Sequence, residues 1–134
     1  MGGFSTVGAG GGIQVFKTTR TTDFSTTSST WVSVVSMTFN LLARSNLLIY
    51  VQPKTFAPYG YNNYQFVLDG SSLMVYRASS HVSYPSYHAN PLMAVAPNIA
   101  AGQHTIDFQM YVESTTSSSI VRSPIDLVVI AFPG

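Results

Sequence analysis

Three histidines are the residues of this chain best suited to metal binding or proton transfer, and no cysteine accompanies them. His81 and His88 lie seven positions apart in one segment, whereas His104 stands at the start of a later predicted strand. A zinc site needs three or four converging Cys, His or carboxylate ligands. Neither a cysteine nor a nearby carboxylate completes such a set for His81 and His88. We therefore expect no metal site, and we expect His104 to hydrogen-bond to the neighbouring backbone.

The patterns of a hydrolase or a nucleotide-binding enzyme are also missing. No G-x-S-x-G segment is present, and the five acids are isolated from one another in the sequence, so a pair of catalytic carboxylates would have to come from distant strands. The glycine-rich stretch 8–12 is not followed by Lys-Ser/Thr or by a helical pattern, as a phosphate-binding loop would be. We expect no enzymatic activity, no catalytic residues and no cofactor.

Tyrosine is the residue type that is enriched in one region. Six of the eight tyrosines fall between positions 59 and 87, in a segment that includes two loops rich in Pro, Asn and Ser. Tyrosine presents a rigid amphipathic surface at low entropic cost, so binding surfaces use it often. We predict four loop tyrosines as partner-binding residues: Tyr59, Tyr61, Tyr84 and Tyr87. Packing on their own domain, contact with a neighbouring capsid or subunit surface, and a platform for a glycan all remain open; Tyr64 and Tyr76 are expected to be structural.

The composition is apolar and nearly uncharged. Charged residues make up 8% of the chain, against roughly 25% in an ordinary soluble domain, and the net charge is +1 with scattered cations. This distribution argues against nucleic acid and against an anionic membrane surface as partners. The hydrophobic fraction is 46%, but no stretch approaches the ~20 apolar residues of a membrane-spanning helix. Burial between subunits is then the expected way to cover the apolar surface.

The apolar residues follow the period of β-strands. Residues 13–24 are Thr-rich and β-branched, and the segment from Trp31 to Ala43 alternates apolar and polar positions. Asp69-Gly70 between two apolar runs, 64–68 and 73–76, predicts a hairpin, because both residues tolerate the positive φ of hairpin turns. Alternation is cleanest in the strand that follows Gly102. No segment of ten or more residues has a helical period, so we predict an all-β fold of about eight antiparallel strands.

Two predicted strands, 47–51 and 125–132, are apolar on both faces except at Asp126. A strand of this kind is covered on both sides, inside a sandwich or at a subunit contact. We predict that these strands contribute the subunit interface through Leu48, Tyr50, Val128, Ile130 and Phe132.

The first twelve residues contain six of the ten glycines and no periodic pattern, so we predict a flexible N-terminal arm (1–12) before a single domain (13–134). A disordered terminus and an arm that orders against a neighbouring subunit are both open. The segment Met1-Gly2-Gly3-Phe4 does not resemble a secretory signal. Use in the cytoplasm and exit from the cell on a virus particle are the two expectations that follow.

Three segments carry a resemblance to a known family: Phe66-Val67-Leu68-Asp69-Gly70, Ile99-Ala100-Ala101-Gly102-Gln103-His104-Thr105-Ile106, and Leu127-Val128-Val129-Ile130. Together they resemble jelly-roll domains of the tumour-necrosis-factor and C1q-like type, as found in viral and phage decoration proteins and fibre heads. The resemblance implies that the fold is a jelly-roll β-sandwich of about eight antiparallel strands. It also implies a trimer with its C-terminal strand near a hydrophobic threefold axis, and binding through loops or intersubunit surfaces. The chain lacks the cysteines and calcium cluster of the signalling members, which argues against a cytokine-like ligand.

The expectation is therefore a non-enzymatic structural protein of a virus or bacteriophage particle, located at the virion surface. Its most specific form is a homotrimeric capsid decoration (cement) protein whose partners are other copies of itself and the major capsid protein. The alternative is a receptor- or carbohydrate-binding head domain, either a fibre knob or a lectin-like module with a glycan as its partner. Neither form requires nucleic acid or a membrane.

Overall fold

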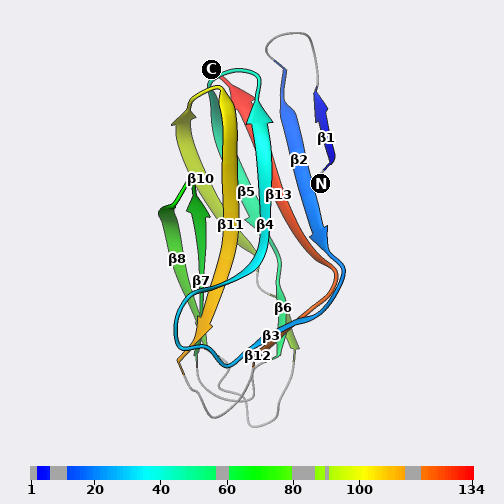
Figure 1. Cartoon of the computed structure of the whole chain (residues 1–134), viewed down its shortest axis with the longest axis vertical. Coiled ribbons are helices and arrows are strands. Elements are labelled where there is room, and N and C mark those ends of the chain that lie inside the picture. The colour runs from blue at the N-terminus through cyan, green and yellow to red at the C-terminus, as the bar shows by residue number, and fades with distance from the viewer. Residues whose placement is uncertain (1–2, 7–11, 57–60, 80–86, 90, 114–118) are drawn as a thin grey trace.

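The computed structural model describes residues 3–6, 12–56, 61–79, 87–89, 91–113 and 119–134, and these form antiparallel strands joined by turns (Figure 1). None of them forms a helix that could cross a membrane. The strands are β1 (Gly3–Thr6), β2 (Gln14–Arg20), β3 (Phe24–Thr26), β4 (Val32–Leu41), β5 (Ser45–Val51), β6 (Lys54–Phe56), β7 (Tyr61–Leu68), β8 (Ser71–Ser79), β9 (Tyr87–Ala89), β10 (Leu92–Ile99), β11 (Gly102–Val112), β12 (Ser119–Arg122) and β13 (Ile125–Pro133).

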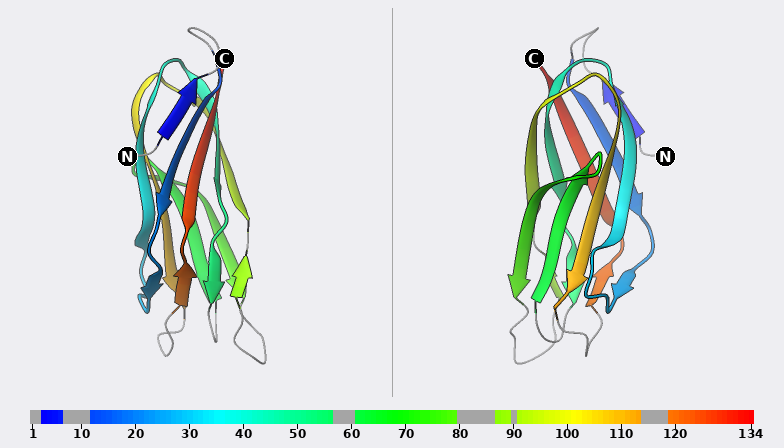
Figure 2. Two further views of the ribbon diagram at one scale, coloured as in Figure 1. Left: turned by 90° about the vertical axis from the view of Figure 1, so that its right-hand side faces the viewer. Right: turned by 60° about the vertical axis from the view of Figure 1, so that its left-hand side comes forward.

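Two sheets face each other and form a jelly-roll sandwich. The five-stranded sheet has the order β1-β2-β13-β5-β10, and the four-stranded sheet has the order β4-β11-β7-β8. Figure 1 shows β4 and β11 in front of β5 and β13, and the left view of Figure 2 shows the five-stranded sheet with its strands side by side. Eight of these strands have seven or more residues, which confirms the all-β jelly roll predicted from the sequence.

A third sheet, β3-β12-β6-β9, continues the five-stranded sheet toward one end of the molecule (Figure 2). Its four strands adjoin β2, β13, β5 and β10 in the sequence, in the same lateral order. Three of the four interruptions contain a proline (Pro53, Pro91 and Pro124), which has no backbone N–H for the sheet. The β-patterned segment 13–24 is thus divided between β2 and β3, and a short strand, β6, follows Pro53.

Asp23 stabilises the backbone at the fourth interruption, which lies between β2 and β3. One oxygen of its carboxylate accepts a hydrogen bond from the Ser123 amide at 2.8 Å, and the other accepts one from Arg122 at 2.9 Å. These two contacts, the amide first, hold the pKa of Asp23 below its usual value. The residue thus links the β2–β3 break to the adjacent β12–β13 break.

The core lies between the two large sheets and follows the alternation expected for half-buried strands. On β11, the side chains of Ile106, Phe108, Met110 and Val112 are all buried. The ring of Phe108 stacks on Tyr64 with a centroid separation of 5.7 Å. The alternation predicted for this strand is confirmed.

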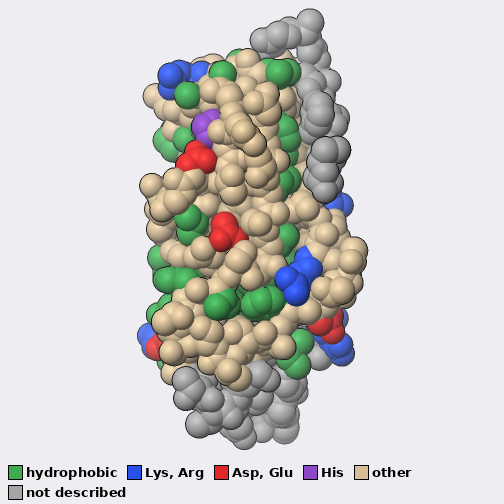
Figure 3. Space-filling model, viewed as in Figure 1, with side chains coloured by type: hydrophobic (Ala, Val, Ile, Leu, Met, Phe, Trp, Pro, Cys, Tyr) green, Lys and Arg blue, Asp and Glu red, His purple; other side chains and the backbone are tan. Residues whose placement is uncertain are grey.

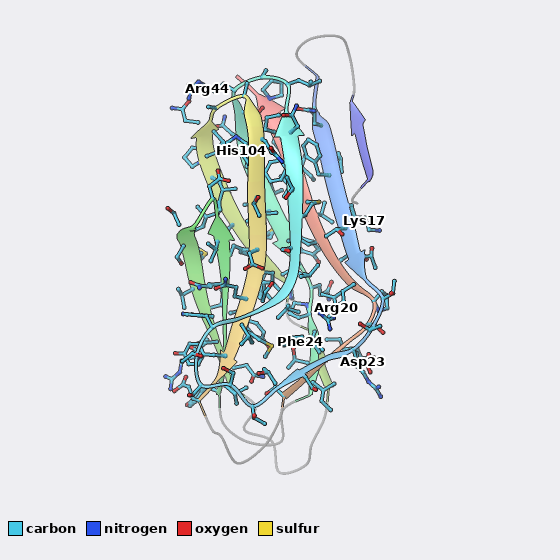
Figure 4. All side chains as sticks on the ribbon, in the orientation of Figure 1. Lys17, Arg20, Asp23, Phe24, Arg44 and His104 are labelled. Carbon is cyan, nitrogen blue, oxygen red and sulfur yellow. The ribbon has the colours of Figure 1, made fainter. Side chains whose placement is uncertain are left out.

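A bulge in β4 explains the one departure from alternation there. The register between β4 and β11 shifts where Val35 pairs with Phe108 and Ser33 pairs with Gln109, and both Val34 and Val35 are buried. The carbonyl of Val34 accepts a hydrogen bond from Arg20 at 3.1 Å. Figure 4 shows Arg20 beside Phe24, whose ring centroid lies 5.1 Å from the guanidinium carbon, so this cation bridges the two sheets at their margin.

The Asp69-Gly70 hairpin forms as predicted between β7 and β8. Both residues have positive φ, 50° and 85°, and Leu68 pairs with Ser71 across a two-residue turn. Positive φ at both positions is the geometry of a type I′ turn, whose twist matches that of the strands. The flanking strands are longer than predicted, because β7 begins at Tyr61 and β8 continues to Ser79.

Candidate functional site

The five predicted interface residues lie together on the outer face of the five-stranded sheet. Val128 on β13 pairs with Tyr50 on β5, and Ile130 pairs with Leu48. On the other side of β5, Tyr50 pairs with Met93 and Leu48 pairs with Val95 of β10. We call the following set the apolar face: Val15, Leu48, Tyr50, Met93, Val95, Val128, Ile130 and Phe132.

The apolar face is exposed to an unusual degree for side chains of this type. Val95 is 67% exposed, Met93 is 50% exposed and Phe132 is 42% exposed, while the other five members are half-buried. The alternate residues of β5 and β13 point into the core and are buried. Both strands are thus apolar on both faces, as the sequence indicated, and the outer one is a contiguous apolar area across four strands. Such areas on soluble proteins mark contact surfaces.

Sequence reasoning missed Met93 and Val95. No residue of the segment 91–99 was assigned to a surface from the sequence. A signal was present in the sequence, because the large side chains of Met93 and Val95 alternate with Ala94 and Ala96. The structure buries both alanines. The pairing of β10 with β5 could not be derived from that alternation, and this pairing joins the two residues to the apolar face.

Polar groups border the apolar face at the end nearer the third sheet. Asp126 accepts a hydrogen bond from Thr19 at 2.5 Å, and Lys17 lies 3.8 Å from the other oxygen of the same carboxylate. The Tyr50 hydroxyl donates to Gln52 at 2.8 Å, toward the same border. Polar and charged side chains thus lie along this border and apolar side chains at the centre, which is the arrangement of a protein–protein interface.

Only part of the predicted tyrosine surface lies among the described residues. Tyr59 and Tyr84 lie outside them, and Tyr87 is placed in β9 by its backbone alone. Tyr61 packs under Arg77, whose guanidinium carbon is 3.7 Å from the ring centroid. Arg77 in turn makes two hydrogen bonds to Glu113, at 2.6 and 2.8 Å. Tyr61 is thus part of an ordered polar cluster at the end of β7 and β8.

The two tyrosines predicted as structural both lie on the strands of the β7–β8 hairpin. Tyr64 is buried, and its hydroxyl donates to Thr55 at 2.8 Å. Burial raises the pKa of Tyr64 above its usual value. The Tyr76 hydroxyl donates to the carbonyl of Met93, which connects the edge strands of the two large sheets.

His104 lies at the start of β11 and bonds at both ring nitrogens. Nδ1 is 2.6 Å from the Asp69 carboxylate and Nε2 is 2.7 Å from the Ala100 carbonyl oxygen, so the backbone contact expected from the sequence is present. Partial burial lowers the pKa of His104, but the bonds to Asp69 and Ala100 outweigh it and hold the pKa above its ordinary value. Partial burial likewise raises the pKa of Asp69, and the bonds from the Thr105 amide and His104 bring it below its usual value.

The other two histidines add no described side chain to a site. His81 lies outside the described residues, and His88 is placed in β9 by its backbone alone. Among the side chains that are described, no three His, Cys, Asp or Glu groups lie close enough to hold a metal ion. The absence of a metal from the whole chain stays a prediction.

Comparison with known proteins supports the fold. No protein-family model and no curated protein sequence matches the chain. Among solved structures, the chain is similar to the C-terminal domain of EclA, a sugar-binding protein, with a TM-score of 0.57 and 10% identity over 80% of this chain and 78% of that one.

Two further structures show the range of proteins with this architecture. The chain is similar to the protein of the T13 particle of infectious bursal disease virus, with a TM-score of 0.50 and 13% identity over 91% of this chain and 36% of that one. It also overlays a CBM36 domain of a xylanase from the hindgut metagenome of Trinervitermes trinervoides, with a TM-score of 0.48 and 10% identity over 90% and 98% of the chains. At identities of 10% and 13%, the likeness to the EclA domain and to the viral protein shows the jelly-roll fold alone.

Proposed function

We propose that this chain is a non-enzymatic structural protein of a virus or phage particle, and that it works as a homotrimer that decorates the capsid surface. The observation that carries this proposal is the apolar face. It spans β2, β13, β5 and β10 and includes all five residues predicted from the sequence as the subunit interface.

The physical reason is that exposure of the apolar face to water is unfavourable. A sheet that needs only one covered side alternates apolar and polar residues, whereas β5 and β13 place apolar side chains on both sides. Three subunits that pack these faces around a common axis would remove them from water, at about 25 cal/mol for each Å² of apolar surface buried. The trimer implied by the resemblance to tumour-necrosis-factor and C1q-like domains has its C-terminal strand near that axis.

Decoration by the trimer would stabilise the assembled capsid through mass action. A trimer that binds the assembled shell and not its separate subunits stabilises the shell by that binding energy. The test compares particles from the wild-type virus with particles from a strain in which the gene is disrupted. We expect the deficient particles to break open at lower temperature, and purified trimer to restore the wild-type value. Equal thermal stability of the two particles, or failure of the trimer to bind deficient particles, would contradict the proposal.

A receptor- or carbohydrate-binding head domain is the second candidate. The ordered cluster of Tyr61, Arg77 and Glu113 favours it, because it lies on the outer side of the four-stranded sheet and contains an aromatic ring and hydrogen-bonding groups. Binding of the trimer to host-cell glycans or proteins, with no binding to deficient particles, would favour this function over decoration.

A further inference from the structure

The outer face of the four-stranded sheet carries a ladder of side-chain hydrogen bonds that crosses all four strands. Ser72 on β8 donates to Gln65 on β7 at 2.8 Å, and Gln65 donates to Gln109 on β11 at 2.6 Å. Gln109 donates to Asp107 at 2.7 Å, and Ser33 on β4 donates to the other Asp107 oxygen at 2.5 Å. We call these five residues the polar ladder.

The carboxylate of Asp107 sets the direction of every bond in the ladder. An ionised carboxylate only accepts hydrogen bonds, so Gln109 must turn its amide nitrogen toward Asp107 and its oxygen toward Gln65. The same logic orients Gln65, whose oxygen then accepts from Ser72. Each amide still has one N–H and one lone pair that the ladder does not use. The ladder therefore holds unused donors and acceptors in fixed orientations.

One residue of the polar ladder is far less exposed than the polar residues of an ordinary solvated sheet surface. Gln65 is only 8% exposed although it lies on an outer face. Glutamine loses considerable rotamer freedom when it is ordered, and that loss has already occurred in the free protein. A ligand that bonds to these side chains would not have to order them again, which favours affinity.

An aromatic pair lies next to the polar ladder on the same face. Tyr111 follows Gln109 by two positions on β11, and Trp31 packs against it edge to face, with centroids 4.7 Å apart at 89°. Both rings are half-buried. Neighbours on one face of a strand are about 6.8 Å apart and adjacent strands about 4.8 Å, so the rings and the ladder fall within the span of a short oligosaccharide.

The charge on this face points to a neutral ligand. Asp107 is the one acid of the ladder, and Arg77 beyond it is already bound by Glu113. Figure 3, which shows the molecule from the side of β4 and β11, displays mainly backbone and uncharged polar side chains, with few acidic or basic groups. A phosphate or an acidic sugar would meet the Asp107 carboxylate with no unengaged cation nearby among the residues the structure describes.

We infer that the polar ladder and the Trp31–Tyr111 pair form a binding site for a neutral oligosaccharide. Sugar hydroxyls both donate and accept hydrogen bonds, which suits the amide and carboxylate groups, and the C–H side of a pyranose ring suits an aromatic face. This site lies on the sheet opposite the apolar face, so both can work in one assembly. The inference does not depend on the trimer.

The experiment uses the intact protein and an array of neutral hexaoses built from glucose, xylose, mannose or galactose, with sialylated glycans and heparin fragments beside them. We expect binding to at least one neutral hexaose and none to the acidic glycans. Titration calorimetry with the best-bound hexaose then compares wild type with Tyr111→Ala and Gln109→Ala. Each variant should lose affinity at least about tenfold, the loss typical of one or two hydrogen bonds or one ring contact.

Two further variants separate binding from folding. Asp107→Ala removes the acceptor that orients Gln109 and Ser33, so it should weaken binding as strongly as Gln109→Ala, and because Asp107 is partly exposed it should change the melting temperature little. Asn40→Ala, exposed at the far end of β4, should bind like wild type. No binding to any neutral hexaose, binding to acidic glycans alone, or unchanged affinity in Tyr111→Ala and Asp107→Ala would overturn the inference. Sedimentation of the same samples reports on the trimer separately.

Discussion

Replacing Ile130 by aspartate should dissociate the trimer and leave the subunit folded. Ile130 lies in the middle of the apolar face, between Val15 and Leu48, and is already half-exposed in the single subunit. Full burial of such a side chain is worth about 1.5–3 kcal/mol, so the substitution should cost the subunit about 1 kcal/mol. In the trimer the new carboxylate would be removed from water, at a cost of several kcal/mol in each subunit.

A cost of about 4 kcal/mol in each subunit corresponds to a roughly thousandfold weaker association for each of the three subunits. At micromolar concentration, sedimentation velocity should then show a single subunit for Ile130→Asp, with a melting transition that remains cooperative. Asn40→Asp adds the same charge to an exposed position on the other sheet and should sediment as a trimer. Val95→Asp, at a position 67% exposed in the subunit, repeats the test where folding is least affected. If Ile130→Asp and Val95→Asp both sediment as wild type, the apolar face is not the interface.

Three further predictions concern the core, the histidine and the tyrosines. Phe108→Ala should lower the free energy of unfolding by about 3–5 kcal/mol in urea titration, because it empties a fully buried site and removes the stack on Tyr64. The His104–Asp69 pair should stabilise the fold most between about pH 4 and 6.5. Because the pKa of His104 is raised in the folded protein, the stability that His104 contributes is present below its unfolded pKa and is lost as the pH rises through its folded pKa. Because the pKa of Asp69 is lowered, the stability that Asp69 contributes is lost in acid. His104→Gln should remove the loss on the alkaline side in melting curves measured across pH. If the loop end of the sheet is the attachment surface, Tyr61→Ala should weaken particle binding by roughly thirtyfold with little change in melting temperature. A lower melting temperature with unchanged particle binding would instead assign Tyr61 a structural role.

The alternation of apolar residues was sufficient to predict an all-β fold, and the family resemblance implied the sandwich. The burial of β11 and the Asp69-Gly70 turn follow from short-range rules, because a period of two and a positive φ are local properties. The end of β5 before Pro53 was predicted, but the short strand β6 after it and the break between β2 and β3 were not. The alignment of the breaks across four strands can be recognised only from the register between those strands. That register depends on contacts between residues far apart in the sequence.

The candidate site also has a part that could be predicted from the sequence and a part that could not. Leu48, Tyr50, Val128, Ile130 and Phe132 could be assigned to one surface because each lies in a strand that is apolar on both faces. Met93 and Val95 needed the pairing of β10 with β5, and the polar ladder needed the order β4-β11-β7-β8. Ser, Gln and Asp scattered along four strands give no local signal, since their hydrogen bonds join residues up to 74 positions apart.

The mass of the untagged wild-type protein in solution tests the central claim most directly. Light scattering coupled to size-exclusion chromatography at micromolar concentration should give a mass close to three times the 14.5 kDa of the chain, unchanged when the sample is diluted about tenfold within the micromolar range. A stable mass of one chain under these conditions would contradict burial of the apolar face between subunits, and with it the proposed role as a trimeric particle protein.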